Sequence, residues 1–320
     1  MTSASTLAPA GTDAPDGASA PAGPAPRRRR ARDHTAPPWY LAVPGFVAFA
    51  AIVLIPTVAG FGVAFTDWSG LGDIENIIGL QNFADILSDK QALGSIRNTV
   101  LLTIVVVVVQ NVLGLLLALG VHSRVKSRYV LRAIFFAPMV VSAVMVSFVW
   151  KFIYNPRPDA GVNGLLGALG LDWLQQDWMG DPSVALWSIA IIVIWQSAGY
   201  SMVIFLAGLS GIPEELYEAA MMDGATPVQR FWHITLPQLA PATTINVLLS
   251  MTGGLTLFTQ VLTTTGGGPG YATETLSTII YKEAFVYGNF GYSAAIAVLL
   301  TIGVSIVAFV QLRFSRRKEN

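Results

Sequence analysis

The side chains that perform covalent chemistry are scarce in this chain of 320 residues. It contains no cysteine, and its three histidines, His34, His122 and His233, lie far apart and outside any HExxH pattern. The glycine cluster at residues 266–270 lacks the Lys-Ser/Thr pair that a phosphate-binding P-loop requires. We therefore expect no catalytic residue, no metal site and no cofactor bound by this chain.

The composition places the chain in a membrane. Hydrophobic residues make up 53% and charged residues 12%, and the mean hydropathy is +0.58, whereas about a quarter of the residues in a soluble protein are charged. A helix needs about 20 residues to cross the bilayer core. We predict an all-α integral membrane protein with six spans, at about residues 39–65, 98–121, 130–153, 184–209, 239–262 and 292–312. Pro56 and Pro138 are expected to kink the first and third spans.

The positions of Lys and Arg residues predict the orientation of these spans. Clusters at residues 27–32, 124–132 and 313–318 fall on one face, and the other face carries only Lys90, Arg97, Lys151, Arg157 and Lys282. Cytoplasmic loops carry the excess of basic residues. We therefore expect both termini to be cytoplasmic.

The two ends of the chain are predicted to be tails. Residues 1–38 contain no apolar run and are interpreted as a disordered cytoplasmic tail, and residues 316–320 as a basic cytoplasmic tail. A signal peptide is a poorer interpretation, because the apolar segment that follows is long and lacks a convincing cleavage site. The arginine run could contact nucleic acid or anionic lipid, but topology and lipid anchoring explain it more simply, so we expect membrane lipid and no nucleic acid as a partner.

A polar interlude at residues 211–237 separates two long apolar segments. Pro213 suits the start of a helix that should run to about residue 223, where Gly224 can adopt a positive φ and end it. Thr226 and Gln229 can form a capping box for a second helix, which should end before Pro237. This pattern predicts a compact two-helix knob that protrudes from the membrane domain. An amphipathic hairpin at the membrane surface would carry the same caps.

The interlude also has a family pattern, filled by Glu218, Ala219, Ala220, Gly224, Ile234, Leu236 and Pro237. It resembles the cytoplasmic coupling loop of permease subunits of binding-protein-dependent ABC importers. The resemblance implies a type I importer permease fold in the cytoplasmic membrane of a bacterial-type cell. It also implies three kinds of partner, namely a second homologous permease subunit, an ABC ATPase dimer that binds ATP and Mg, and an extracytoplasmic sugar-binding protein. By the same resemblance Glu218 would make an ionic contact with the ATPase, Ala219 and Ala220 would pack closely, and Gly224 would be the hinge; Asp223 adds to the acidic surface.

A second stretch indicates the class of solute. Residues 262–285, LTTTGGGPGYATETLSTIIYKEAF, look like the segment after the fifth span in the carbohydrate-uptake branch of these permeases, of the maltose and glycerol-phosphate type. With shorter matches such as residues 65–68, 79–83 and 206–213, the resemblance covers about residues 39–315. It implies transport of a sugar. The alternatives are an ABC permease for a non-sugar solute, such as phosphate, a polyamine or a peptide, and a stand-alone secondary carrier. No acidic, basic or histidine side chain lies near the middle of a predicted span, which favours a neutral solute and gives a carrier no charge relay.

Polar and small side chains in the predicted fifth span recur at helical spacing. Asn246, Ser250, Gly253, Leu257 and Gln260 are 4, 3, 4 and 3 residues apart, which would place them on one face of a single helix. That face could line the translocation path or pack against other helices, since the same residue types join membrane helices. Gln196 beside Trp195, and Gln110 beside Asn111, are further candidates of the same kind.

Overall fold

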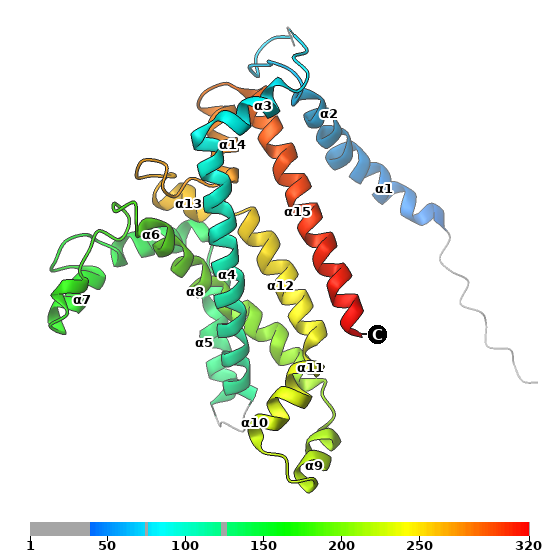
Figure 1. Cartoon of the computed structure of the whole chain (residues 1–320), viewed down its shortest axis with the longest axis vertical. Coiled ribbons are helices and arrows are strands. Elements are labelled where there is room, and N and C mark those ends of the chain that lie inside the picture. The colour runs from blue at the N-terminus through cyan, green and yellow to red at the C-terminus, as the bar shows by residue number, and fades with distance from the viewer. Residues whose placement is uncertain (1–38, 74–75, 123–126, 320) are drawn as a thin grey trace, which may run out of the picture. The chain divides into compact units, whose positions relative to one another are not determined.

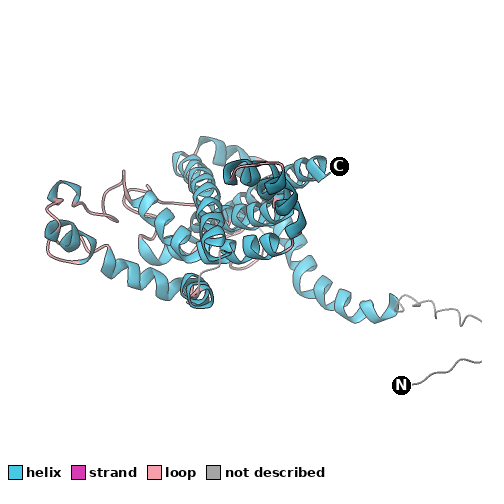
Figure 2. Cartoon of the chain, turned by 90° about the horizontal axis from the view of Figure 1, so that it is seen from below, coloured by secondary structure: helices cyan, strands magenta, loops and turns pink. Residues whose placement is uncertain are grey.

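The computed structural model describes residues 39–73, 76–122 and 127–319. The described residues form helices and connecting loops, with one isolated β-bridge between Thr66 and Ile77 (Figures 1 and 2). The predicted tail at residues 1–38 lies outside the described residues. The predicted all-α class is confirmed for the described part of the chain.

The described helices, given in chain order, include short 3-10 (η1, η3) and π (η2, η4) segments. They are η1 (Trp39–Ala42), α1 (Val43–Phe49), η2 (Ala50–Leu54), α2 (Ile55–Val63), α3 (Gln81–Ser88), α4 (Lys90–His122), α5 (Arg128–Val140), α6 (Ala143–Ile153), α7 (Gly161–Ala168), η3 (Asp172–Leu174), α8 (Ala185–Ser210), α9 (Glu214–Met222), α10 (Pro227–Arg230), η4 (Phe231–Thr235), α11 (Leu236–Gln238), α12 (Ala240–Leu255), α13 (Thr259–Thr264), α14 (Leu276–Phe285) and α15 (Phe290–Glu319).

The chain divides into two compact units after Val53. In the first unit, η1 and α1 lead into the π-helical turn η2, and none of the residues of α1 is buried. The second unit begins at Leu54 and holds all the elements from α2 onward.

Four helical segments of the described chain are long and apolar enough to cross a membrane: Val43–Val63, Lys90–His122, Ala185–Ser210 and Phe290–Arg313. The pair α5 and α6 makes a fifth if it is counted as one span. The count of six and the cytoplasmic position of both ends therefore stay predictions. The last helix continues to Glu319, so residues 316–319, expected as a tail, extend α15.

Two of the predicted spans are broken helices. The third span is divided at Val141 and Ser142, where α5 and α6 meet at a bend of 99°. This break follows the expected kink at Pro138 by three residues. The predicted fifth span, 239–262, is not one helix, because α12 ends at Leu255 and α13 starts only at Thr259. The expectation of one continuous helix along that span is wrong for this reason.

Helix α8 is the packing centre of the second unit. It contacts α4, α5, α6, α12 and α13, and its buried Ile189 and Val193 pack with Leu102 and Val106 of α4. The backbones approach closely at Gly199, where an added Cβ would lie 1.9 Å from the carbonyl oxygen of Phe135. Small residues allow such contacts between membrane helices.

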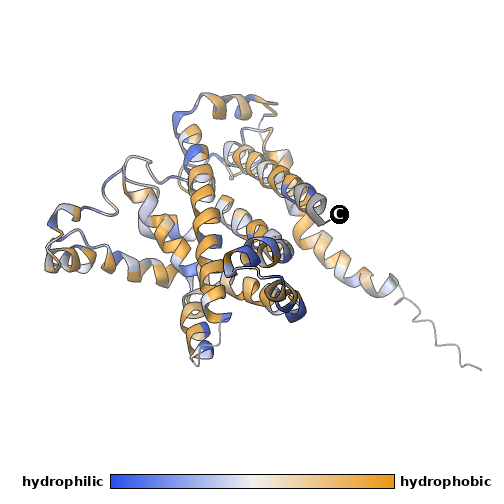
Figure 3. Cartoon of the chain, turned by 60° about the horizontal axis from the view of Figure 1, so that its bottom comes forward, coloured by the Kyte–Doolittle hydropathy of each residue, from blue (hydrophilic) through white to orange (hydrophobic). Residues whose placement is uncertain are grey.

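The outer surfaces of the long helices are apolar. On α4 the side chains of Ile104, Val108 and Leu116 are all more than half exposed, and on α15 those of Ile306 and Phe309 are too. Figure 3 shows hydrophobic residues along most of the length of the long helices. Lipid tails cover such surfaces in a bilayer, where the helix satisfies its own backbone hydrogen bonds.

Candidate functional site

The first helix of the predicted knob, α9, has the expected bounds. It follows Pro213, runs over Glu214–Met222 and places Glu214 and Glu215 in its first turn, where carboxylates stabilise the positive end of the helix dipole. Gly224 has a φ of +78°, and the N–H of Ala225 returns to the carbonyl of Ala220 over 2.9 Å. The predicted stop at Gly224 is confirmed.

The second helix of the knob begins as predicted but ends later. Thr226 and Gln229 form the capping box, in which the N–H of Thr226 donates to Gln229 Oε1 over 2.8 Å. The helix does not stop before Pro237, because the π-turn η4 leads from α10 directly into α11, which contains Pro237. That stop was predicted wrongly. The bias of the residue before a proline against helix is overridden here by a locally widened helical turn.

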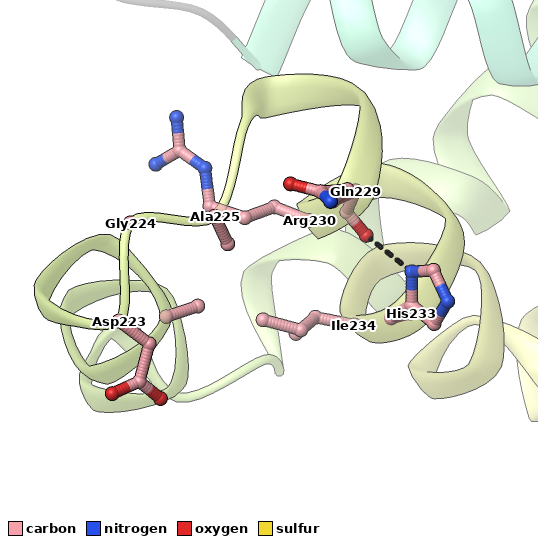
Figure 4. Close-up of a pocket in the computed structure, with 8 residues that line it drawn as sticks. Asp223, Gly224, Ala225, Gln229, Arg230, His233 and Ile234 are labelled. Atoms are coloured by element: carbon pink, nitrogen blue, oxygen red, sulfur yellow. Dashed lines mark hydrogen bonds between the residues drawn. The ribbon is translucent and has the colours of Figure 1, made fainter.

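A cleft of about 340 Å³ lies between the two helices of the knob (Figure 4). It is lined by Ala220, Asp223, Gly224, Ala225, Gln229, Arg230, His233 and Ile234. The His233 ring is fixed by a hydrogen bond between its Nδ1 and the carbonyl of Gln229, 2.9 Å away. The hydroxyls of Tyr217 in α9 and Thr235 in η4 are hydrogen-bonded over 2.9 Å and join the two halves of the knob.

The surface of the knob is acidic and partly apolar. Glu218, Ala219 and Asp223 are exposed, as is Pro237, whereas Ala220, Ile234 and Leu236 are half-buried. Among the described residues, Glu218 has no ion-pair partner. Large apolar side chains are exposed beside these residues: Met222 by 89%, Val228 by 66% and Trp232 by 59%. A surface that combines carboxylates with exposed apolar side chains is typical of a docking site for another protein.

A second cavity, also of about 340 Å³, lies among the long helices. It is lined by Val106, Gln110, Met139, Val193, Ser197, Tyr200, Leu249, Ser250, Gly253, Gly254, Leu257 and Gln260. None of these lining residues is charged. The lining comes from α4, α5, α8, α12 and α13 and from the break between α12 and α13.

The cavity brings some of the predicted path residues together and leaves two out. Ser250, Gly253 and Gln260 line it. Asn246 lies outside the lining, is 1% exposed, and donates a hydrogen bond to the carbonyl of Ser201 on α8 over 3.2 Å. Gln196 is also outside the lining; its side chain lies between Val141 and Gln260.

Sequence reasoning missed Ser197 and Tyr200, which line the cavity from α8. They follow Gln196 by one and four residues. The recurrence of polar residues within the predicted fourth span could therefore have identified them as candidates. The cavity also includes Gln110, whose Nε2 donates to the Ser201 hydroxyl over 2.9 Å. Asn111, beside it, donates to the Ser250 hydroxyl over 2.9 Å.

The glycine-rich loop after α13 is held in place by hydrogen bonds and an ion pair. Asn98 of α4 donates to the carbonyls of Tyr271 and Glu274, over 3.3 and 3.1 Å. The Glu274 carboxylate is fully buried and paired with Lys282. An added Cβ at Gly267 would meet this ion pair. No side chain fits at this position, which therefore requires glycine. Within the described part of the chain, no group of His, Asp or Glu side chains could hold a metal ion.

Comparison with known proteins gives this arrangement a family. Residues 110–320 match the family described as "Binding-protein-dependent transport system inner membrane component". The chain belongs to this family. The permease is therefore an inner-membrane protein.

Two similar relatives are named as permease proteins. The permease is 36% identical over 279 residues to the probable ABC transporter permease protein YurN of Bacillus subtilis, covering 87% of this chain and 95% of the relative. It is 31% identical over 281 residues to the multiple sugar-binding transport system permease protein MsmF of Streptococcus mutans, covering 88% and 96%.

Among solved structures, the permease has the fold of a chain in a bacterial ABC transporter that imports the acidic polysaccharide alginate. The TM-score is 0.77 at 23% identity, over 87% of this chain and 94% of the other. The likeness at this identity concerns the fold. It confirms the type I importer fold expected from the sequence.

Proposed function

We propose that this permease is the membrane subunit of an ATP-driven importer that moves a sugar, a mono- or oligosaccharide, across the cytoplasmic membrane. It acts with a second homologous permease subunit, an ABC ATPase dimer that holds ATP and Mg, and an extracytoplasmic sugar-binding protein. Six spans would place both termini and the knob in the cytoplasm.

The exposed knob is the observation that carries this proposal. Met222 and Val228 project from a polar, acidic segment outside the long helices and are 89% and 66% exposed. Burying these side chains against a partner removes apolar surface from water, which contributes about 25 cal/mol per Å². The carboxylates of Glu214, Glu215, Glu218 and Asp223 favour a basic groove on the ATPase.

The chain connects the knob directly to the cavity. Helix α9 starts four residues after the end of α8, and α11 leads into α12 within two residues. Both α8 and α12 line the cavity. Movement of the docked knob during ATP binding would therefore shift two walls of the cavity, because a helix transmits displacement along its axis as a rigid element.

The chemistry of the cavity supports a neutral, hydroxyl-bearing solute. Gln110, Ser197, Tyr200, Ser250 and Gln260 offer amide and hydroxyl groups that both donate and accept hydrogen bonds. No charged side chain lines this cavity, so a phosphate or a polyamine would be desolvated without a compensating charge. Relatives named for sugar transport, such as MsmF and the trehalose/maltose permease MalF of Thermococcus litoralis, point to the same class.

The proposal is tested by purifying the tagged permease from its native membranes in mild detergent and identifying its companions by mass spectrometry. We expect an ATPase and a second permease. The reconstituted complex should take up a sugar only with ATP and the binding protein.

Three results would count against parts of the proposal. A permease that purifies alone under stabilising conditions would favour a secondary carrier. Uptake of a non-sugar solute by the complete complex would retain the importer and reject the sugar. The ionic contact of Glu218 is tested by whether the ATPase still co-purifies with the permease. If Glu218→Ala loses the ATPase and Glu214→Ala keeps it, Glu218 makes the contact. If both variants keep the ATPase, that role of Glu218 is rejected.

A further inference from the structure

The two broken helices of the permease meet at a single side chain. The break between α5 and α6 and the break between α12 and α13 both lie against the middle of α8. Gln196 of α8 is hydrogen-bonded to both of them. It is 6% exposed.

At the first break, the chain leaves a carbonyl without a helical partner. Val141 has extended backbone angles and Ser142 caps the start of α6. Gln196 Nε2 donates to the carbonyl oxygen of Val141 over 3.0 Å. A free carbonyl in the membrane interior is unfavourable by several kcal/mol, so this hydrogen bond stabilises the bent arrangement.

At the second break, the oxygen of the same Gln196 amide accepts a hydrogen bond. Gln260 Nε2 in the first turn of α13 donates to Gln196 Oε1 over 3.0 Å. The two bonds use the donor and the acceptor of one amide, so the side chain cannot turn over without breaking both.

The segments before the breaks are held by close backbone contacts, whereas those after the breaks are held by side chains. Gly199 of α8 is pressed against Phe135 of α5, and an added Cβ at Gly254 of α12 would lie 3.0 Å from Thr103 of α4. Beyond the breaks, α6 and α13 pack against each other. Val146 of α6 also clusters with Ile192 of α8, and Val261 of α13 with Ile189 of α8, so α6 and α13 form one side-chain-packed layer against α8.

We propose that Gln196 is a positioning residue that latches α6 and α13 to α8 and keeps the cavity closed on the side away from the knob. Gln260 lines the cavity while it is bonded to Gln196. The latch itself does not rest on the proposed solute class.

The test uses the absence of cysteine from the chain. A single Gly253→Cys reporter lines the cavity at a position where an added Cβ meets nothing within 4 Å. The complete importer is reconstituted in vesicles, and a membrane-impermeant thiol reagent is applied on the face opposite the knob, without ATP or solute. The rate of labelling measures how often the cavity opens to that face.

We expect Gln196→Leu, which removes both hydrogen bonds, to raise the labelling rate about thirtyfold, the effect on an opening equilibrium of two net hydrogen bonds of about 1 kcal/mol each. Gln260→Leu, which removes only the α13 arm, should raise it less. The double variant should label no faster than Gln196→Leu alone, because both changes act on one latch.

Gln311→Leu is the matched control. It removes a similar bond between helices, from Gln311 Nε2 of α15 to the carbonyl of Thr244 on α12 over 3.0 Å, and should leave the labelling rate unchanged. Equal rates in wild type and Gln196→Leu, additive effects of the two variants, or an equal rise with Gln311→Leu would each overturn the proposal. If Gln196→Leu fails to assemble, Gln260→Leu alone decides, since it keeps the Val141 arm. The readout needs no sugar, so its failure is distinct from failure of the proposed solute class.

Discussion

The hinge of the knob offers a sharp test of coupling, because Gly224 can be changed without creating a clash. Its φ is +78°, and an added Cβ there meets nothing within 4 Å. The cost of a substitution is therefore a cost of backbone conformation. A left-handed residue with a Cβ is disfavoured by roughly 1–2 kcal/mol, with β-branched residues worst and asparagine tolerated best.

These values predict a graded loss of the docking conformation. About 1 kcal/mol for Gly224→Ala lowers its population about fivefold, and about 2 kcal/mol for Gly224→Val lowers it about thirtyfold, relative to a competing knob conformation. Gly224→Asn should stay close to wild type. Gly303→Ala is the matched control, since Gly303 lies within α15, has no positive φ and also has open space around it.

The assay compares ATP-driven uptake with ATP hydrolysis in the reconstituted importer, after the amount of permease in the membrane has been measured. Solute taken up per ATP hydrolysed should be highest in Gly224→Asn, lower in Gly224→Ala and lowest in Gly224→Val. The permease itself should still be present in the membrane in all three variants. Normal uptake with Gly224→Val, or an order that follows side-chain size with Asn as low as Val, would refute the argument from backbone conformation.

Further predictions concern the cavity, the helix contacts and the cap. Gln260→Leu should raise the KM for uptake, whereas Asn246→Leu should lower thermal stability in detergent and leave the KM unchanged, because only the former lines the cavity; the opposite pattern would reverse the two roles. Gly199→Ala should destabilise the permease by about 1–3 kcal/mol, since its Cβ would lie 1.9 Å from a backbone oxygen, and an unchanged melting temperature would show that α5 and α8 can separate freely. Thr226→Ala removes the cap of α10, worth about 1 kcal/mol, and should reduce uptake per ATP; Thr226→Ser should restore it.

The knob was predictable from the sequence because its signals act over a few residues. Pro213 and Gly224 bound the first helix, and Thr226 with Gln229 starts the second. Each of these effects depends on the residue's own backbone or on a side chain three residues away. The prediction failed at Pro237, where the outcome depended on a π-turn that no local signal announced.

The long apolar segments and their location in lipid could also be predicted from the sequence, because hydropathy and length decide whether a helix belongs in a bilayer. Where the helices break was decided by the tertiary structure. The spacing of Ser250, Gly253 and Gln260 fits one helix, yet the helix is interrupted between Leu255 and Thr259. Gln260 there meets Gln196, a residue 64 positions away, and Gln196 meets Val141, 55 positions away. A buried polar group in a membrane must find a partner, and only the packed bundle determines which distant group is near enough to be that partner.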